Sequence, residues 1–336
     1  MIPDATIVIT SYGGAERLPR CISSIDRQTI RARLEVIVVD DGSTDDTAVV
    51  AERLGARVIS HGRNRGIAAA RNSGLGAAET ELVILLDDDC EAEPEWAAAM
   101  LNQAQRDDVS VVGGELVIVP NDRGFCGGYL QRNNPFKPVE ASLLQSDGAL
   151  FRLREYLGAN WRPTTLTGPR VVFSVAGGNA CFRRSQVREA GHFTEGAPAA
   201  EETELCLRLR DIFPACHVVY QPAARVVHYT ETGFRTLMRR SRQYGRGNAF
   251  LMRARGSRRP TIFPAPLLVG GVVVGAVFAP TALLLAILLP PLFFPAGVRT
   301  ALRTRRAAPL VDPYVRLAIE AAGNVGFVEQ LIRGRA

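Results

Sequence analysis

The stretch Leu82-Val83-Ile84-Leu85-Leu86, followed directly by Asp87-Asp88-Asp89, indicates the fold. An apolar run of this length is typical of a buried strand. Adjacent carboxylates repel one another unless water surrounds them or they share a cation. At the carboxyl end of a strand in an open α/β sheet, where ligands bind, the pattern favours a Mg²⁺ or Mn²⁺ site. A solvated acidic loop is the alternative.

Apolar runs of strand length alternate with helical patterns before residue 90, and the strand-like runs are 5–10, 34–39, 57–60 and 82–86. This alternation predicts a parallel, doubly wound α/β sheet. Right-handed crossovers place the carboxyl ends of all these strands at one edge. We therefore expect a nucleotide and metal site at this edge, built from Thr10, Tyr12, Asp41 and Asp87–Asp89.

Arg71 lies in a helical segment that begins near Asn64, and its guanidinium can donate two hydrogen bonds to a phosphate at the same edge. No GxGxxG follows the first strand and no Walker A loop is present, which disfavours a Rossmann dehydrogenase and a P-loop NTPase. A nucleotidyltransferase stays an alternative, although Ser11-Tyr12-Gly13-Gly14 is a poor match to the basic glycine-rich loop that it needs.

Three segments in this order resemble the family 2 glycosyltransferases of the GT-A fold: Val38–Asp45, Asn64–Gly74 and Leu86–Asp89. The resemblance covers roughly residues 3–230. It implies a GT-A α/β fold with a mixed, mainly parallel sheet and flanking helices. It also implies an inverting transfer of a sugar from a nucleotide-diphosphate donor, with a UDP-sugar favoured and Mg²⁺ or Mn²⁺ as cofactor. A glycan or lipid-linked acceptor is expected.

The resemblance also implies roles for individual residues. Asp41 contacts the base, Arg71 lies near the phosphates, and Asp89 binds the metal. Asp87 serves the ribose or the metal, and His228 helps to hold the metal or diphosphate. The remaining residues expected to bind the donor are Asp88, whose side chain should point away from the metal, and Gly178 and Asn179 in Gly177-Gly178-Asn179.

The catalytic base is expected in Glu201-Glu202, just before a helix. The family usually has Glu-Asp here, with the aspartate as base, and Glu202 occupies that position. A glutamate can take the proton of an acceptor hydroxyl equally well, but its extra methylene moves the carboxylate by about an ångström. Glu201 is the rival candidate. A non-catalytic, membrane-tethered nucleotide-sugar-binding protein remains a further alternative.

The carboxyl-terminal third is basic and then apolar. Nine arginines and no acid lie between Arg235 and Arg259, and residues 262–298 carry no charge. The basic stretch predicts a helix at a membrane surface rather than a nucleic-acid site, because the apolar segment follows it. The apolar segment exceeds the roughly 20 residues that span a bilayer, but its prolines predict a kinked span or two short helices hinged near Pro280. A buried hairpin in a soluble domain is the alternative.

The predicted organisation is a catalytic domain (1–230), a basic interfacial helix (231–260), a transmembrane or re-entrant segment (261–298) and a basic tail (299–336) that lies on the bilayer or packs on the domain. Basic flanks on both sides of the apolar segment favour a re-entrant hairpin. No signal peptide is recognised at Met1, so we expect the catalytic domain on the cytoplasmic face of the inner membrane. The six scattered cysteines are expected to be reduced.

Overall fold

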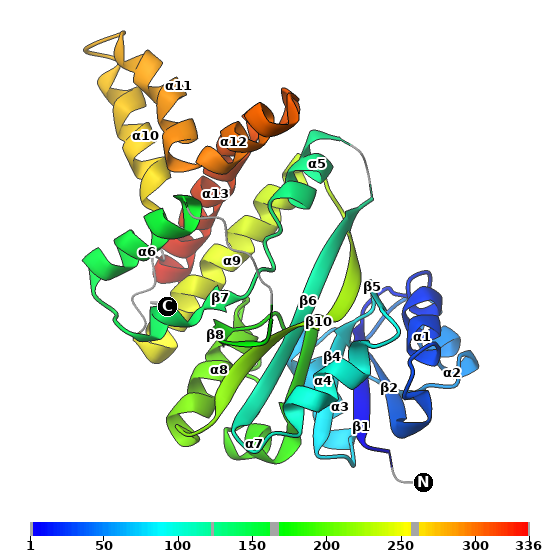
Figure 1. Cartoon of the computed structure of the whole chain (residues 1–336). Coiled ribbons are helices and arrows are strands. Elements are labelled where there is room, and N and C mark those ends of the chain that lie inside the picture. Colours follow the sequence, from blue (N-terminus) through cyan, green and yellow to red (C-terminus); the bar gives the residue numbers. More distant parts are fainter. Residues whose placement is uncertain (1–2, 122–123, 162–167, 257–261, 335–336) are drawn as a thin grey trace.

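The computed structural model describes residues 3–121, 124–161, 168–256 and 262–334. Arg258 and Arg259 of the basic run lie outside these ranges. The described chain is built around one twisted mixed sheet with helices on both faces, and a group of carboxyl-terminal helices lies beside it (Figure 1). All six cysteines are free, and five of them are buried.

The sheet runs in the order β3 (Arg57–Ser60), β2 (Leu34–Asp40), β1 (Ala5–Ser11), β4 (Leu82–Asp87), β9 (Asn179–Arg183), β6 (Val109–Pro120), β10 (His217–Thr230), β8 (Arg170–Ser174) and β7 (Val139–Glu140). The short strand β5 (Cys90–Ala92) pairs with β10. β3, β2, β1 and β4 are parallel, as predicted. β9 is antiparallel to both β4 and β6, and the sequence did not predict it as a strand.

Two apolar clusters lie on the two faces of the sheet. Helices α1 (Leu18–Asp26), α2 (Thr47–Arg53) and α4 (Trp96–Ala104) cover one face. Helices α3 (Ile67–Ala77), α7 (Arg184–Glu189) and α8 (Glu201–Ile212) cover the other. Ile7 and Ile9 belong to the first cluster and Val8 to the second, because successive side chains of a strand point to opposite faces. The short 3₁₀ helices are η1 (Arg31–Arg33), η2 (Ala141–Leu144) and η3 (Ala308–Val311).

The register aligns the carboxyl ends of three neighbouring strands. Ser11 of β1 pairs with Asp40 of β2, and Thr10 pairs with Asp87 of β4. Burying each large apolar side chain of these strands contributes about 1.5–3 kcal/mol, which holds the register because a one-residue slip would turn those side chains outward. The acidic ends of β2 and β4 therefore lie at one edge, as expected.

The group of helices beside the sheet combines two helices from the middle of the chain with five carboxyl-terminal ones. They are α5 (Phe125–Arg132), α6 (Ala149–Trp161), α9 (Phe234–Arg255), α10 (Pro264–Gly275), α11 (Ala282–Phe293), α12 (Pro295–Thr304) and α13 (Asp312–Arg333). α13 packs along α9 at close range, since a Cβ at Gly245 would lie 1.9 Å from the carbonyl oxygen of Gly323. α13 therefore covers the buried side of α9. The tail thus packs on the protein, which is one of the two arrangements expected for it. The interfacial role expected of residues 231–260 stays a prediction.

Helices α10 and α11 form a hairpin that projects from the body, with a turn near Pro280 (Figure 1). The structure therefore has two short helices hinged near Pro280, which is one of the two arrangements predicted from the sequence. None of the described helices alone is long and apolar enough to cross a membrane. α11 and α12 together have the required length and composition, but they are bent by 77°.

Candidate active site

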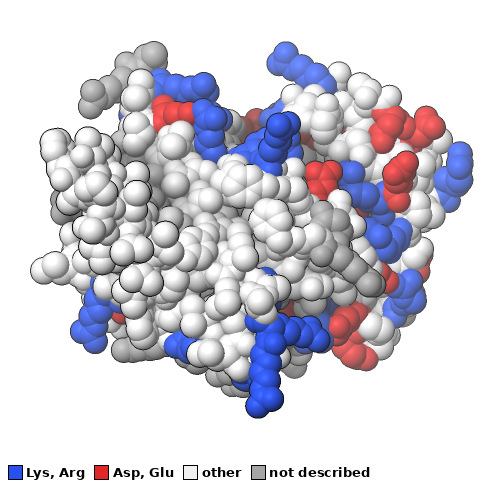
Figure 2. Space-filling view, turned by 90° about the horizontal axis from the view of Figure 1, so that it is seen from above, with Lys and Arg blue, Asp and Glu red and all other residues white. Residues whose placement is uncertain are grey.

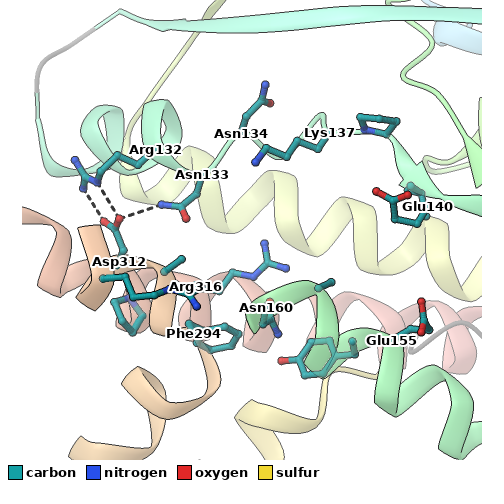
Figure 3. Close-up of a pocket in the computed structure, with 18 of the residues that line it drawn as sticks. Arg132, Asn133, Asn134, Lys137, Glu140, Glu155, Asn160, Phe294, Asp312 and Arg316 are labelled. Carbon is teal, nitrogen blue, oxygen red and sulfur yellow. Dashed lines mark hydrogen bonds and ion pairs between the residues drawn. The ribbon is translucent and has the colours of Figure 1, made fainter. Parts of the chain in front are cut away.

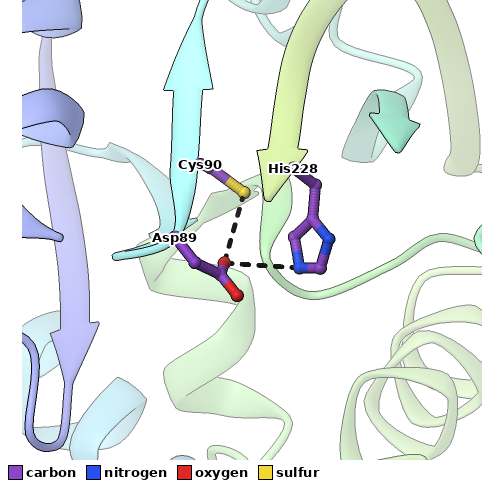
Figure 4. A group of neighbouring side chains, drawn as sticks. All are labelled: Asp89, Cys90 and His228. Atoms are coloured by element: carbon purple, nitrogen blue, oxygen red, sulfur yellow. Dashed lines mark hydrogen bonds and ion pairs between the residues drawn. The ribbon is translucent and has the colours of Figure 1, made fainter. Parts of the chain in front are cut away.

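Asp89 and His228 face each other at the carboxyl edge of the sheet (Figure 4). An oxygen of Asp89 lies 3.3 Å from Nε2 of His228, and the Nδ1 of His228 is hydrogen-bonded to the Thr230 hydroxyl. The strand β5 pairs with β10 antiparallel and matches Cys90 with His228, which brings these side chains together. Burial alone would raise the pKa of Asp89, but the hydrogen bond and charge of His228 lower it below its usual value.

A carboxylate and an imidazole fit a divalent cation. Cys90 lies within 4.8 Å of both groups and completes the only cluster of potential ligands found in the described part of the chain. Burial raises the pKa of the Cys90 thiol well above its usual value, so this group stays protonated at neutral pH. Mg²⁺ and Mn²⁺ prefer oxygen ligands, so Asp89 would be the main ligand of such an ion, with the imidazole of His228 beside it as a second ligand.

Asp87 belongs to a second, neighbouring group around Arg71. Nη2 of Arg71 lies 3.6 Å from Asp87 and Nη1 lies 2.7 Å from Glu201. Burial raises the pKa of Asp87, and the charge of Arg71 partly offsets this. Arg71 is only 4% exposed, and it joins β4 to the start of α8 and positions two carboxylates. The phosphate contact expected of Arg71 stays a prediction.

Glu202 lies beside this group at the start of α8 and is half-buried. Burial and the neighbouring charge of Glu201 raise the pKa of Glu202 to about 8, although Arg71 acts in the opposite direction. Glu201 is buried, and one of its oxygens accepts a hydrogen bond from Arg71. The two glutamates therefore have different environments: Glu201 is held by an ion pair, whereas Glu202 has the proton affinity that a base needs near neutral pH.

Asp88 is a structural residue. Its carboxylate accepts hydrogen bonds from Ser11 at 2.5 Å and from the guanidinium of Arg17 at 2.9 Å, and it is 7% exposed. It thus turns toward β1 and α1 and is absent from the cluster formed by Asp89. The contact with the donor that was expected of Asp88 stays a prediction.

The side chain of Asn179 is also held within the protein. It is fully buried, its oxygen accepts a hydrogen bond from Trp96, and its nitrogen donates to the carbonyl oxygens of Glu115 and Ala224. These bonds tie β9 to β6, β10 and α4. Both polar atoms of this side chain are thus paired in the core, and the contact with the donor that was expected of Asn179 stays a prediction.

Asp41, Thr10 and Tyr12 lie where the sequence placed them. Asp41 accepts hydrogen bonds from the backbone N–H groups of Arg65 and Gly66 and pairs with His61 at 2.7 Å. These bonds hold the loop before α3 against the end of β2. The Tyr12 ring is 55% exposed, whereas Thr10 is buried between β2 and β4. The base contact expected of Asp41 stays a prediction.

Gly177 and Gly178 allow the close approach of backbone and charged groups. A Cβ at Gly177 would lie 2.5 Å from Nη1 of Arg71, and one at Gly178 would lie 2.0 Å from Oδ2 of Asp87. The amide of Asp87 also donates to the carbonyl of Gly178. The two glycines therefore leave room for the Arg71–Asp87 pair at the end of β4.

Gly178→Ala is expected to lower turnover by about a hundredfold, because the new methyl group would displace the carboxylate of Asp87. A displacement of about 1 Å at a catalytic site can lower the rate by this factor. Overpacking of this kind also destabilises a fold by about 1–3 kcal/mol. The rate of turnover and thermal unfolding measure the two effects. Gly76→Ala is the control, since nothing lies within 4 Å of its Cβ position in α3. Full activity in Gly178→Ala would contradict the view that the position of Asp87 beside Gly178 matters for catalysis.

The sequence gave no role at the site to α9, yet this helix passes over it. The charge of Arg240 contributes to lowering the pKa of Asp89. Partial burial, together with the nearby carboxylate of Glu202, raises the pKa of Tyr244 to about 12. In the sequence, the alternation of arginines with aromatic residues in this segment indicated a helix at a membrane surface. It gave no sign that α9 lies close to the residues of the site. Arg17 and His61, which hold Asp88 and Asp41, were also missed.

Comparison with known proteins places this geometry among sugar transferases. The model of the family described as "Glycosyl transferase family 2" matches residues 6–189. The "Pre-mycofactocin glycosyltransferase" of Mycobacterium tuberculosis is 29% identical over 271 residues, which are 80% of this chain and 50% of the relative. The chain thus spans about half the length of this curated relative.

Two solved structures share the fold. "Mannosyltransferase PcManGT from Pyrobaculum calidifontis in complex with GDP-Man and Mn2+" superposes with a TM-score of 0.64 at 16% identity, covering 98% of this chain and 88% of that one. The structure of "GalNAc-T7 with UDP, GalNAc and Mn2+" gives a TM-score of 0.52 at 17% identity, covering 76% and 51%. These matches confirm the predicted GT-A-like α/β fold with its mixed sheet and flanking helices.

Proposed function

Because this chain belongs to glycosyl transferase family 2, we propose that it transfers a sugar from a nucleotide-diphosphate donor to a glycan or lipid-linked acceptor, with inversion at the anomeric carbon. The observation that carries the proposal is the pairing of Asp89 with His228 beside the Arg71–Asp87–Glu201 group and the half-buried Glu202. Mg²⁺ or Mn²⁺ is the cofactor, and UDP-sugars are the favoured donors. The two structural neighbours were solved with GDP-Man or UDP and with Mn²⁺, which supports a nucleotide donor and a divalent cation.

The chemistry assigned to these residues is a single displacement. Glu202 takes the proton of the acceptor hydroxyl while that oxygen forms a bond to the anomeric carbon. The bond between the anomeric carbon and the diphosphate breaks on the opposite face, and the diphosphate leaves with the electron pair. Asp89 and His228 would hold a divalent cation, which would supply positive charge to offset the charge that develops on the leaving diphosphate. Arg71 keeps Asp87 and Glu201 in place throughout.

A thermal-shift screen of nucleoside diphosphates with Mn²⁺ tests the donor class. A ligand at about a hundred times its dissociation constant stabilises the native state by about 2.7 kcal/mol. We therefore expect UDP with Mn²⁺ to raise the melting temperature by a few degrees, and UDP with EDTA to leave it unchanged. If GDP gives the larger shift, the preference for uracil is wrong. If every nucleoside diphosphate is without effect, the proposed donor class is wrong.

The projecting hairpin supports attachment to a membrane. Phe278 is 89% exposed and Val277 78%, and most other apolar side chains of α10 and α11 are at least half exposed. Figure 2 shows a broad uncharged surface at this end of the molecule, with Lys and Arg side chains at its margins. Each helix has 12 residues, or about 18 Å, which matches one leaflet rather than the roughly 30 Å bilayer core. A re-entrant hairpin with its basic flanks on the cytoplasmic side fits these dimensions.

The double substitution Val277→Asn with Phe278→Asn is expected to weaken binding to lipid vesicles by about tenfold or more, because each buried side chain contributes about 1.5–3 kcal/mol. Co-sedimentation with vesicles measures this. Val49→Asn is the control, since Val49 is 51% exposed on α2, away from the hairpin. Point substitutions are preferable to a truncation, because removing α13 would uncover α9. Equal vesicle binding by the double variant and the wild type would contradict membrane insertion.

A further inference from the structure

A cavity of about 730 Å³ lies between the catalytic domain and the base of the apolar hairpin (Figure 3). Its walls come from α6, α12, α13 and the segment from the end of α5 to β7. This volume lies in the range of about 300–1,000 Å³ that small-molecule sites usually occupy. The cavity is separate from the group around Asp89, so neither the donor nor the metal accounts for it.

The cavity is lined by more cations than acids. Its acids are Glu140, Glu155 and Asp312, and its cations are Arg132, Lys137, Arg152, Arg170, Arg299, Arg303 and Arg316. Asp312 is fully used by bonds from Arg132 and Asn133. Within the described ranges, Lys137 and Arg303 have no carboxylate at ion-pair distance. Figure 3 shows Lys137 and Arg316 on opposite sides of the space. Arg316 is paired with Glu320, so an anion in the cavity would be attracted chiefly by cations without a carboxylate partner, such as Lys137 and Arg303.

Arg152 gives the strongest indication of what the cavity holds. It is 3% exposed, and one nitrogen of its guanidinium pairs with Asp147. Its Nε and Nη1 atoms are buried and have no hydrogen-bond partner among the described residues, and the same holds for Nε of Arg170. A buried donor left unpaired destabilises the fold, so an acceptor oxygen in the cavity is favoured. A guanidinium recognises phosphate oxygens in particular, because its N–H groups form a planar fork.

One wall of the cavity is apolar and continues into the hairpin. Phe294 and Tyr156 line the cavity and share a small apolar cluster with Ala265, in the first turn of α10. α6 contacts both α11 and α12. A hydrocarbon chain attached to a group in the cavity can therefore leave along the exposed apolar side chains of α10 and α11. Neither a free phosphate nor a soluble sugar phosphate would make use of this exit.

The opposite wall adjoins the catalytic residues. Asn134 and Lys137 line the cavity, while Phe136 between them packs its ring against His228 with 5.1 Å between the ring centres. The same short segment thus faces the cavity on one side and the Asp89–His228 pair on the other. A group bound in the cavity lies one layer of residues from the expected site of transfer.

We propose that this cavity binds the phosphate or diphosphate group of a lipid-linked acceptor, whose hydrocarbon chain lies along the α10–α11 hairpin. The proposal rests on the proposed function, and it names the acceptor class for that function. Lys137, Arg152 and Arg303 bind the phosphate oxygens. A hydroxyl of the group already attached to that phosphate is presented past Phe136 toward Glu202, which takes its proton. Sugar transfer to such an acceptor requires an earlier reaction that places the phosphate on the lipid.

Isothermal titration calorimetry of the full chain in phosphatidylcholine nanodiscs tests the proposal, with farnesyl phosphate, farnesol and inorganic phosphate as probes. We expect farnesyl phosphate to bind about tenfold or more tightly than either other probe. The exposed pair Lys137→Gln with Arg303→Gln is expected to lose about tenfold of that affinity, whereas Arg306→Gln, three residues farther along and outside the cavity, keeps it. Farnesyl phosphate binding no tighter than farnesol, or equal binding by the double variant and the wild type, would overturn the proposal.

A competition experiment separates the two sources of a lipid phosphate. If phosphatidylglycerol displaces farnesyl phosphate at equal lipid concentration, the cavity takes a bilayer headgroup and the acceptor assignment is overturned. Retention of farnesyl phosphate supports the assignment. UDP binding with Mn²⁺ is measured on the same wild-type sample. If UDP binds but farnesyl phosphate does not, only the cavity proposal is overturned. If farnesyl phosphate binds but UDP does not, only the proposed donor chemistry is overturned.

Discussion

Asp89→Ala is expected to abolish the metal dependence of nucleotide binding and to weaken UDP binding in the presence of Mn²⁺ by about a hundredfold or more. Asp89 is the carboxylate that faces His228, at 3.3 Å from its Nε2 atom. No second carboxylate of the described chain joins that cluster, because Asp87 pairs with Arg71 and Asp88 with Arg17. Its removal therefore leaves a divalent cation with a single imidazole. Calorimetric titration of UDP, with Mn²⁺ and with EDTA, measures the change.

Asp46→Ala is the matched control for this variant. Asp46 is exposed beyond the end of β2, and its side chain makes no capping hydrogen bond at the start of α2. We expect wild-type UDP affinity in Asp46→Ala. Unchanged metal-dependent binding of UDP in Asp89→Ala would contradict the role of Asp89 and would mean that the cation binds elsewhere at the strand edge.

Glu202→Gln is expected to lower turnover by about 10²- to 10⁴-fold while the affinity for the donor stays unchanged. The substitution keeps the shape of the side chain and removes its ability to accept a proton. Glu201 is a poorer candidate for the base, because Arg71 binds one of its oxygens at 2.7 Å and it is buried. Donor affinity by calorimetry and turnover by nucleotide release separate the two effects. Near-normal turnover in Glu202→Gln would contradict Glu202 as the base and would indicate Glu201 in its place.

The pH dependence gives a second readout for Glu202. Its pKa is raised to about 8, so at neutral pH most of the free enzyme carries a protonated, inactive glutamic acid. A base acts only when deprotonated. We therefore expect kcat/KM to rise about tenfold per pH unit below pH 8 and to level off above it. A profile that is flat between pH 6 and 9 would contradict a base with this pKa.

The parallel half of the sheet could be predicted from the sequence because its strands are short apolar runs separated by amphipathic helices. That pattern also fixes the edge at which Asp41 and Asp87–Asp89 meet, since parallel strands end on one side. His228 and Glu202 were found through the family resemblance rather than through any local pattern. The structure brings His228 to Asp89 through the pairing of β5 with β10.

The errors share a physical cause, which is pairing between residues distant in the chain. β9 lies between β4 and β6 only in the folded sheet, and its five residues carry too little periodicity to be recognised alone. The three adjacent aspartates look alike in the sequence, but Arg71, Arg17 and His228 each select one of them. Likewise, the apolar side of α9 resembles a membrane-binding surface until α13, which comes last in the chain, packs on it.

The central claim is that this chain breaks the bond between the anomeric carbon and the diphosphate of a nucleotide sugar, with Glu202 as base and a cation at Asp89 and His228. Phosphorus NMR tests it most directly, with UDP-sugars and GDP-mannose as substrates, Mg²⁺ as the cation, and water or a lipid-linked sugar with a free hydroxyl group as acceptor. We predict release of the nucleoside diphosphate that requires Mg²⁺ and is about a hundredfold slower in Glu202→Gln. Release of a nucleoside monophosphate together with a sugar phosphate would mean that the pyrophosphate bond breaks instead, and would contradict the claim.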